Sequence, residues 1–242
     1  MRLSGDARFT PVFSLAGRTS NPVLPPVAHR TGGFGGAQGL ADWLRAEDID
    51  AIVDATHPFA ARISANAAVA ARQLGLPILF LQRPPWRQED GDNWTRVADI
   101  VQAAAALGEQ PATVFLGIGR QEVAAFKASP QHFYVVRAIE APAADSLPPR
   151  SEVVLQRGPF ELGAEREMLS AHGIECVVSK NSGGSAAYAK IAAARQLGLR
   201  VVMVERVPLP DGATVSGVDE AMHWLGKALA ARHDTPVSER GV

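Results

Sequence analysis

The segment Ile49–Pro84 reads IDAIVDATHPFAARISANAAVAARQLGLPILFLQRP, and Ile174–Pro208 reads IECVVSKNSGGSAAYAKIAAARQLGLRVVMVERVP. Each predicts a short apolar strand, a polar turn, an alanine-rich helix and a second apolar strand that ends in arginine. The hexapeptide ARQLGL occurs in both, as Ala71–Leu76 and Ala194–Leu199. Its glycine follows the last helical leucine, where a left-handed cap favours glycine. The repeat indicates two similar α/β halves, although any two strand–helix–strand units share such patterning.

The rest of the chain alternates short β-branched segments with longer segments rich in alanine and leucine, which is typical of βαβ units. The predicted strands are Val12–Ala16, Ala51–Asp54, Ile78–Leu81, Thr113–Leu116, Phe133–Arg137, Val153–Gln156, Cys176–Ser179 and Val201–Glu205. The predicted helices are Gln38–Ala46, Pro58–Leu74, Ala98–Leu107, Gln121–Lys127, Glu161–Ala171, Gly184–Leu197 and Val218–Ala230. We therefore predict two α/β domains, residues 1–109 and 110–242, whose mostly parallel sheets line a cleft between them.

The composition excludes several classes of protein. Lysine and arginine (24) nearly balance aspartate and glutamate (25) in the 242 residues, which argues against a nucleic-acid binder. The single cysteine excludes an internal disulfide and a cysteine metal cage. No apolar run is long enough to span a membrane, and no signal-peptide core follows the first residues. We expect a cytoplasmic protein that binds no membrane.

The turn Gly17–Pro22 is the first candidate site, because ligands of open parallel sheets bind beyond the carboxyl ends of the strands. It offers the side chains of Arg18, Thr19 and Ser20 but no carboxylate. In dinucleotide folds an acidic residue here selects a free 2′-hydroxyl, whereas arginine accommodates a 2′-phosphate. The turn therefore favours NADP over NAD if a dinucleotide binds, although such residues also populate ordinary solvated turns.

A glycine loop that holds the phosphates of a dinucleotide normally follows a first strand. Only eleven residues precede Val12, and they contain no such loop. The segment Thr31–Gly39 is rich in glycine but lacks the G-x-G-x-x-G spacing, so a flexible loop explains it equally well. We expect this chain to hold a cofactor pyrophosphate more weakly than a chain with the loop.

The turn Asp54–Ala60 follows a predicted strand. Pro58 stands where the first helical residue is expected, and Thr56 can cap that helix. His57 lies in the turn itself, where an imidazole can donate to a substrate or orient a nicotinamide. A structural histidine with satisfied hydrogen bonds is the alternative.

Two later turns have the composition of anion sites. Gly117–Gln121 ends a strand and opens a predicted helix, which by itself explains its glycines. Ser179–Ser185 (SKNSGGS) offers backbone amides, hydroxyls and one ammonium to a carboxylate or phosphate at a predicted helix start. The six histidines show no metal-ligand spacing, and no G-x-S-x-G elbow is present. Any demanding chemistry is therefore expected from a cofactor rather than a metal.

These turns resemble the precorrin-6A reductase family of cobalamin biosynthesis. The resemblance rests on AGRTSNP (Ala16–Pro22), DATHPFAARISANA (Asp54–Ala67), GIGRQ (Gly117–Gln121) and the stretch Ser179–Arg206. It implies two Rossmann-like domains around a cleft, and an NADPH-dependent reduction of one double bond of the precorrin-6A macrocycle. The family normally opens with a strand and a glycine-rich turn that this sequence lacks before Phe13.

The resemblance also implies residue roles. Arg18, Thr19 and Ser20 would contact the ribose phosphate of NADP, and Thr56, His57, Pro58 and Phe59 would line its nicotinamide side, with His57 as the catalytic residue. The residues that would face the tetrapyrrole are Arg120, Gln121, Lys180, Asn181, Ser182, Gly183 and Gly184. Two alternatives stay open: another NADP-dependent reductase of an anionic substrate, and a non-catalytic ligand-binding protein built from two α/β halves.

Overall fold

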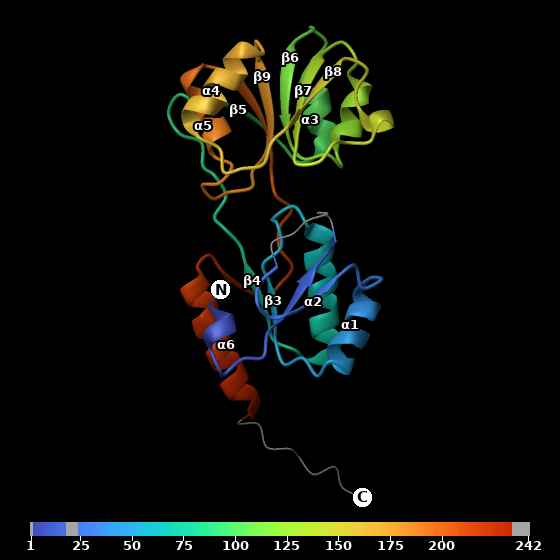
Figure 1. Ribbon diagram of the computed structural model, residues 1–242, viewed down its shortest axis with the longest axis vertical. Coiled ribbons are helices and arrows are strands. Elements are labelled where there is room, and N and C mark those ends of the chain that lie inside the picture. The colour runs from blue at the N-terminus through green and yellow to red at the C-terminus, as the bar shows by residue number, and fades with distance from the viewer. Residues whose placement is uncertain (1, 18–23, 234–242) are drawn as a thin grey trace, which may run out of the picture.

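The computed structural model describes residues 2–17 and 24–233 of the chain. All pairings between neighbouring strands in its three sheets are parallel. One group of elements contains a six-stranded sheet, and the other contains a two-stranded and a three-stranded sheet (Figure 1). The prediction of an α/β protein with parallel sheets is confirmed. No helix in the described ranges has the length and apolar character needed to cross a membrane.

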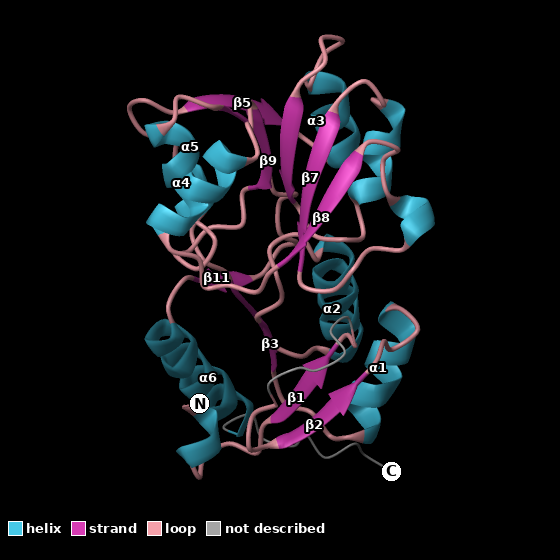
Figure 2. Cartoon of the chain, turned by 45° about the horizontal axis from the view of Figure 1, so that its top comes forward, coloured by secondary structure: helices cyan, strands magenta, loops and turns pink. Residues whose placement is uncertain are grey.

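The six-stranded sheet has the strand order β5-β10-β9-β6-β7-β8. Its helices lie on both faces, α3 on one and α4 with α5 on the other (Figure 2). Burial on both faces explains why the central strands are mostly apolar. The elements are β5 (Asn93–Val97), α3 (Ile100–Ala106), β6 (Thr113–Gly117), the 3₁₀ helix η2 (Val123–Ala128), β7 (Phe133–Ala138), the 3₁₀ helix η3 (Ala144–Ser146), β8 (Ser151–Leu155), α4 (Leu162–Ala171), β9 (Cys176–Lys180), α5 (Ala189–Gln196) and β10 (Arg200–Val204).

The second group of elements combines the start and the end of the described chain. Its sheets are β1-β2 and β11-β4-β3, with α1 and α2 on one side and α6 on the other (Figure 2). The elements are the 3₁₀ helix η1 (Leu3–Gly5), β1 (Val12–Leu15), β2 (Ala28–Thr31), α1 (Ala37–Ala46), β3 (Ile52–Asp54), α2 (Ala61–Leu74), β4 (Ile78–Leu81), β11 (Ala213–Val215) and α6 (Val218–His233). Strands β3 and β4, with the helix between them, form the first copy of the repeat.

The chain passes twice between the two groups (Figure 1). After β4 it crosses to form β5 at the edge of the six-stranded sheet, beside β10. After β10 it crosses back to form β11, beside β4. We call residues 82–86 the first crossing segment and residues 205–208 the second crossing segment. Each copy of the repeat therefore ends where a crossing begins.

The predicted boundary between residues 109 and 110 does not coincide with the division between the sheets. Strand β5 and helix α3 precede it but belong to the six-stranded sheet, whereas β11 and α6 follow it but belong with β4. The two copies exchange the strand and helix that follow them. The open edge of β4 or β10 can pair with β5 or with β11, because strand pairing uses backbone hydrogen bonds that every sequence can form. The sequence of a repeat copy therefore does not reveal which of these two strands lies beside it.

Two helices begin later in the chain than predicted. Helix α2 begins at Ala61 instead of Pro58, because residues 57–60 form a tight turn in which the Ala60 N–H donates to the His57 carbonyl at 2.7 Å. Helix α5 begins at Ala189 instead of Gly184. Gly183 and Gly184 have φ values of +65° and +71°, which an α-helix does not admit. The predicted helix at Gln121–Lys127 is the 3₁₀ helix η2.

Candidate functional site

The turn after β3 presents a carboxylate at the carboxyl end of the strand. Asp54 is buried, and its Oδ1 accepts a hydrogen bond from the Thr56 N–H at 2.9 Å. Its Oδ2 is also buried and has no hydrogen-bond partner among the described residues. The Thr56 hydroxyl lies 3.5 Å from that of Ser64 and caps no helix, contrary to the prediction. The turn therefore keeps an unused acceptor where a cofactor amide or hydroxyl can donate.

His57 lies in the same turn, and its Nδ1 accepts a hydrogen bond from the Phe59 N–H at 3.3 Å. Partial burial of the ring and, to a lesser extent, the positive charges of Lys180, Arg83, Arg206 and Lys190 together lower the pKa of His57 to about 4. The residue is still partly open to solvent. The site therefore has a positive potential, and its imidazole is neutral at neutral pH.

Phe59 and Lys180 bring the turns of the two repeat copies together. Lys180 ends β9, and its Nζ lies 5.1 Å from the centroid of the Phe59 ring. Phe59 also packs against the buried core of the six-stranded sheet. The Lys180 ammonium forms an ion pair with Glu122. A residue predicted for the cofactor side thus contacts a residue predicted for the substrate side.

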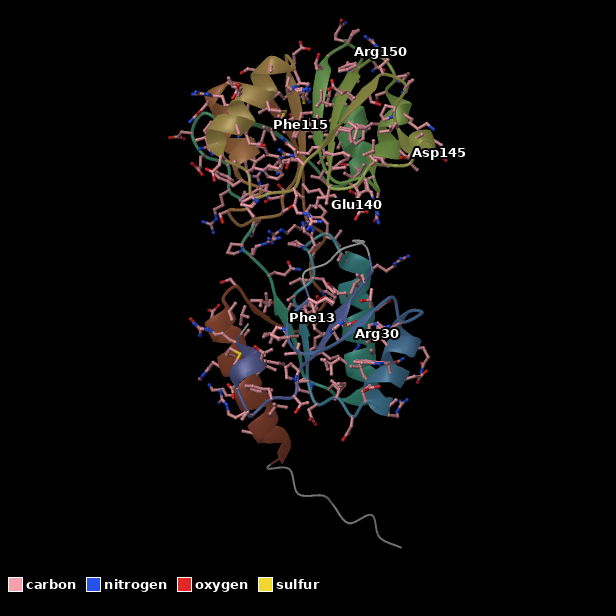
Figure 3. The ribbon with its side chains drawn as sticks, in the orientation of Figure 1. Phe13, Arg30, Phe115, Glu140, Asp145 and Arg150 are labelled. Carbon is pink, nitrogen blue, oxygen red and sulfur yellow. The ribbon has the colours of Figure 1, made fainter. Side chains whose placement is uncertain are left out.

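The turn after β6 lies at the same edge of the sheet. Arg120 forms an ion pair with Glu140 at 2.7 Å. Glu140 lies at the end of the six-stranded group that faces the other group of elements, and Arg150 lies at the opposite end (Figure 3). Gln121 is exposed beside Arg120. Both predicted residues therefore lie at the carboxyl end of the sheet, in the turn after β6.

The glycine turn, residues 181–184, packs against the first crossing segment. The side chain of Asn181 is buried, and its Oδ1 accepts from the Trp86 N–H at 2.8 Å. Its Nδ2 donates to the Trp86 carbonyl and to Glu205 Oε2, both at 3.2 Å. The indole of Trp86 donates to the Gly184 carbonyl at 2.8 Å. The Asn181 side chain thus forms its hydrogen bonds within the protein, and the charged group next to the turn is Lys180, the last residue of β9.

The remaining predicted cofactor residues, Arg18, Thr19 and Ser20, lie outside the described residues. The glycine-rich segment that follows β2 is organised by Arg30, which lies 3.8 Å from the centroid of the Phe34 ring. The Arg30 guanidinium also donates to the carbonyls of Gly32 and Gly33 at 2.9 and 3.1 Å. Figure 3 shows Arg30 in the group of elements that also contains β1. These contacts hold the start of the segment, Gly32 to Phe34, against the Arg30 side chain.

Sequence reasoning missed the two crossing segments as part of the site. A cavity of about 430 Å³ lies at the carboxyl ends of β4 and β11, lined by Arg83, Arg206, Thr214, Ser216 and Glu220 among others. The available signal was the arginine that ends each copy of the repeat. In the part of the chain that the structure describes, no three histidine, cysteine, aspartate or glutamate side chains gather as a metal site.

Comparison with known proteins identifies the family of the chain. A family model described as precorrin-6x reductase CbiJ/CobK matches residues 2–226. A precorrin-6A reductase of a Sinorhizobium species is 49% identical over 231 residues, which cover 94% of this chain and 88% of the relative. The precorrin-6A reductase of Rhodobacter capsulatus is 44% identical over 220 residues, 91% of this chain and 88% of the relative.

A solved structure named CobK precorrin-6A reductase has the same fold. It superposes with a TM-score of 0.85 at 43% identity, and the match covers 96% of this chain and 89% of that chain. The likeness therefore spans both groups of elements and both crossing segments. The family resemblance seen in the turns is confirmed: the chain belongs to the precorrin-6x reductase CbiJ/CobK family, and it is an oxidoreductase.

Proposed function

We propose that this protein uses NADPH to reduce one double bond of the precorrin-6A macrocycle, as a step of cobalamin biosynthesis. Its curated relatives carry the name precorrin-6A reductase. The observation that carries the proposal is the meeting of Phe59 and Lys180, which joins a cofactor-side turn to a cationic turn of the other sheet. A flat macrocycle fringed with carboxylates needs such a boundary between apolar and cationic surfaces.

The residues at the end of β3 fit a nicotinamide cofactor. The buried and unpartnered Oδ2 of Asp54 can accept from the carboxamide or a ribose hydroxyl. The Thr56 hydroxyl and the backbone of Pro58 and Phe59 line the same turn. The nicotinamide supplies the hydride when it is bound. The protein's part is to hold both reactants face to face and to exclude water.

The preference for NADP over NAD rests on the turn that contains Arg18, Thr19 and Ser20. The sequence of this turn contains no carboxylate, and it offers one guanidinium and two hydroxyls, which are groups that suit a 2′-phosphate. Arg18→Ala should weaken NADP binding by about 1.5–3 kcal/mol and leave NAD binding little changed, as calorimetry can measure. Equal losses for both cofactors would rule out this role for Arg18.

The substrate side uses Lys180, Arg120 and the glycine turn. The ion pair of Lys180 with Glu122 keeps the ammonium at the junction, and a substrate carboxylate can replace Glu122 as its partner. Lys180 then holds the substrate instead of transferring a proton. The backbone N–H groups of Gly183 and Gly184 and the side chains of Ser182 and Gln121 complete this side.

His57 is the proposed catalytic residue. Its imidazole is neutral in the ligand-free protein because its pKa is about 4. A neutral ring orients the nicotinamide or the macrocycle through a hydrogen bond. Binding of a polyanionic substrate raises this pKa, because the new negative charges offset the surrounding cations.

An anaerobic assay that follows NADPH oxidation with precorrin-6A tests the function. The wild-type protein should accelerate oxidation, and Lys180→Ala should raise the Michaelis constant for precorrin-6A more than it lowers the turnover number. Arg72→Ala, which removes an exposed helical arginine, is the matched control and should behave as wild type. Binding of NADPH and precorrin-6A without oxidation would instead favour a ligand-binding protein. A collapse of turnover in Lys180→Ala at unchanged affinity would make Lys180 the proton donor.

A further inference from the structure

The arginines that end the two repeat copies lie side by side at the crossing. The guanidinium of Arg206 donates through Nη1 to the Arg83 carbonyl and through Nε to the Asn181 carbonyl, both at 2.7 Å. Arg206 thereby joins the second crossing segment to the first crossing segment and to the glycine turn. The two positions correspond in the repeat, but only the tertiary structure brings them into contact.

The glycine turn leaves room for both arginine side chains. A Cβ atom on Gly184 would lie 2.7 Å from Arg83 Cδ, and a Cβ atom on Gly183 would lie 2.4 Å from Arg206 Nη2. The Nη2 atom is buried and has no hydrogen-bond partner among the described residues. The two glycines therefore permit a close approach of two cations to the turn that carries Lys180.

The charge around this pair is positive. Burial and the neighbouring charge of Arg83 lower the pKa of Arg206, and Glu205 only partly offsets them. Both arginines also lower the pKa of His57. They line the cavity of about 430 Å³ together with the polar residues Thr214 and Ser216. The lining also includes the carboxylate of Glu220. Its Oε2 already accepts a hydrogen bond from the Gly217 N–H at 2.8 Å.

We propose that Arg83 binds a peripheral carboxylate of the macrocycle in this cavity, and that Arg206 is a positioning residue that holds Arg83 there. This inference rests on the proposed function, because it assigns one carboxylate of that substrate. A guanidinium presents two parallel N–H donors that match the geometry of a carboxylate. Arg206 fixes the backbone of Arg83 by donating a hydrogen bond to its carbonyl. Its own positive charge lies next to Gly183 and adds to the attraction for a carboxylate.

Kinetics of Arg83→Met separates the two anions that the reaction brings to the site. The Michaelis constant for precorrin-6A should rise about 10- to 100-fold, while the Michaelis constant for NADPH and the turnover number should change little. A rise confined to the Michaelis constant for NADPH would assign Arg83 to a cofactor phosphate and overturn the proposal. Arg72→Met is the control for loss of an arginine remote from the cavity.

Arg206 is tested by a pair of variants. Arg206→Met should raise the precorrin-6A constant with little change in turnover, and Arg206→Lys should recover part of the affinity, because it keeps the charge and one donor. Circular dichroism confirms that both variants are folded. Equal behaviour of the two variants would remove the positioning role. If Arg206→Met does not fold, the comparison of Arg206→Lys with wild type decides, and an unchanged substrate constant would overturn the role.

A binding experiment gives a readout without turnover. Uroporphyrin, a stable macrocycle with acetate and propionate side chains, is titrated into protein with ¹⁵N-labelled histidine. Uroporphyrin should raise the pKa of His57 in the wild-type protein, and Arg83→Met should weaken its binding about 10-fold or more. Equal affinity of both proteins for uroporphyrin would overturn the proposal, even where the wild type reduces precorrin-6A. Conversely, a wild type that binds uroporphyrin through Arg83 but oxidises no NADPH would refute only the proposed function.

Discussion

The hexapeptide ARQLGL has two different environments in the two copies of the repeat. In the first copy Arg72 is exposed on α2. In the second copy Arg195 donates through Nε to Asp92 Oδ1 and through Nη1 to Glu89 Oε2, both at 2.9 Å. Both acidic residues lie between the first crossing segment and β5. The same six residues thus form the same helix end in both copies. The arginine of the second copy has acidic partners because the chain between the first crossing segment and β5 passes beside it.

The strands of the two copies differ in the same way. Strand β9 lies between β10 and β6, and its first four residues are buried. Strand β3, its counterpart, lies at the edge of a three-stranded sheet, and only its last residue is buried. Local sequence therefore determines which element forms, whereas the position of a strand in its sheet determines how far that strand is buried.

The largest expected effect on stability distinguishes a glycine packed against the first crossing segment, Gly183, from a glycine at an open helix end, Gly75. Gly183 and Gly75 both have a φ of +65°. A Cβ on Gly183 would lie 2.0 Å from the Pro84 carbonyl oxygen, whereas a Cβ on Gly75 meets nothing within 4 Å. Gly183→Ala should therefore lower the free energy of unfolding by about 3–5 kcal/mol in urea denaturation. A loss no greater than that of Gly75→Ala would show that the crossing packs loosely.

The next effect distinguishes the two arginines of the hexapeptide. Arg195→Ala leaves the fully buried side chain of Asp92 without its ion-pair partner. We expect a loss of about 2–4 kcal/mol in the free energy of unfolding, reduced from that of a fully buried pair because Arg195 is partly exposed. Arg72→Ala should change it by less than about 0.5 kcal/mol. Equal losses in thermal or urea unfolding would contradict the importance of the crossover.

A third effect concerns Lys190, which corresponds to Ala67 when the two hexapeptides are aligned. Burial lowers the pKa of Lys190 from 10.5 to about 7, with a further contribution from Arg137 that Glu165 opposes. Between pH 7 and 10 the unfolded chain binds this proton and the folded protein does not, so stability rises with pH. The free energy of unfolding should rise by about 2 kcal/mol from pH 7 to pH 9. In Lys190→Met this rise should be absent; an unchanged pH dependence would contradict the assignment.

The smallest effect should be the same in both copies. Gly75 and Gly198 are the glycines of the two hexapeptides. Their φ values are +65° and +66°, and a Cβ atom on either would meet nothing within 4 Å. Gly75→Ala and Gly198→Ala should each cost about 1–2 kcal/mol, because the left-handed conformation alone is penalised. Calorimetric unfolding of the two variants checks this. A large difference between them would show that the helix ends are not set locally.

The candidate site was predictable where a turn follows a strand. His57 and Lys180 each follow the first strand of a repeat copy, and the structure brings their turns together through Phe59. Glu122 was not predictable as a site residue, because it acquires its role from a partner distant in sequence. The signal for Arg83 was only its place at the end of a repeat copy, and its contact with Arg206 is long-range. The roles of Arg18, Thr19 and Ser20 stay predictions.

The sequence by itself determined the α/β class, the strand–turn–helix–strand repeat and the turns at the strand ends, because hydrophobic periodicity and glycine caps act over a few residues. The tertiary structure alone decided that β5 and β11 exchange sheets, because a parallel edge accepts any extended segment through backbone groups that all sequences share. That exchange brings Arg83 against Arg206 and lets the Trp86 indole donate a hydrogen bond to the glycine turn. The two kinds of interaction act over different distances along the chain. Patterns within a few residues determine each helix or strand, and backbone pairing between distant segments determines which strands are neighbours.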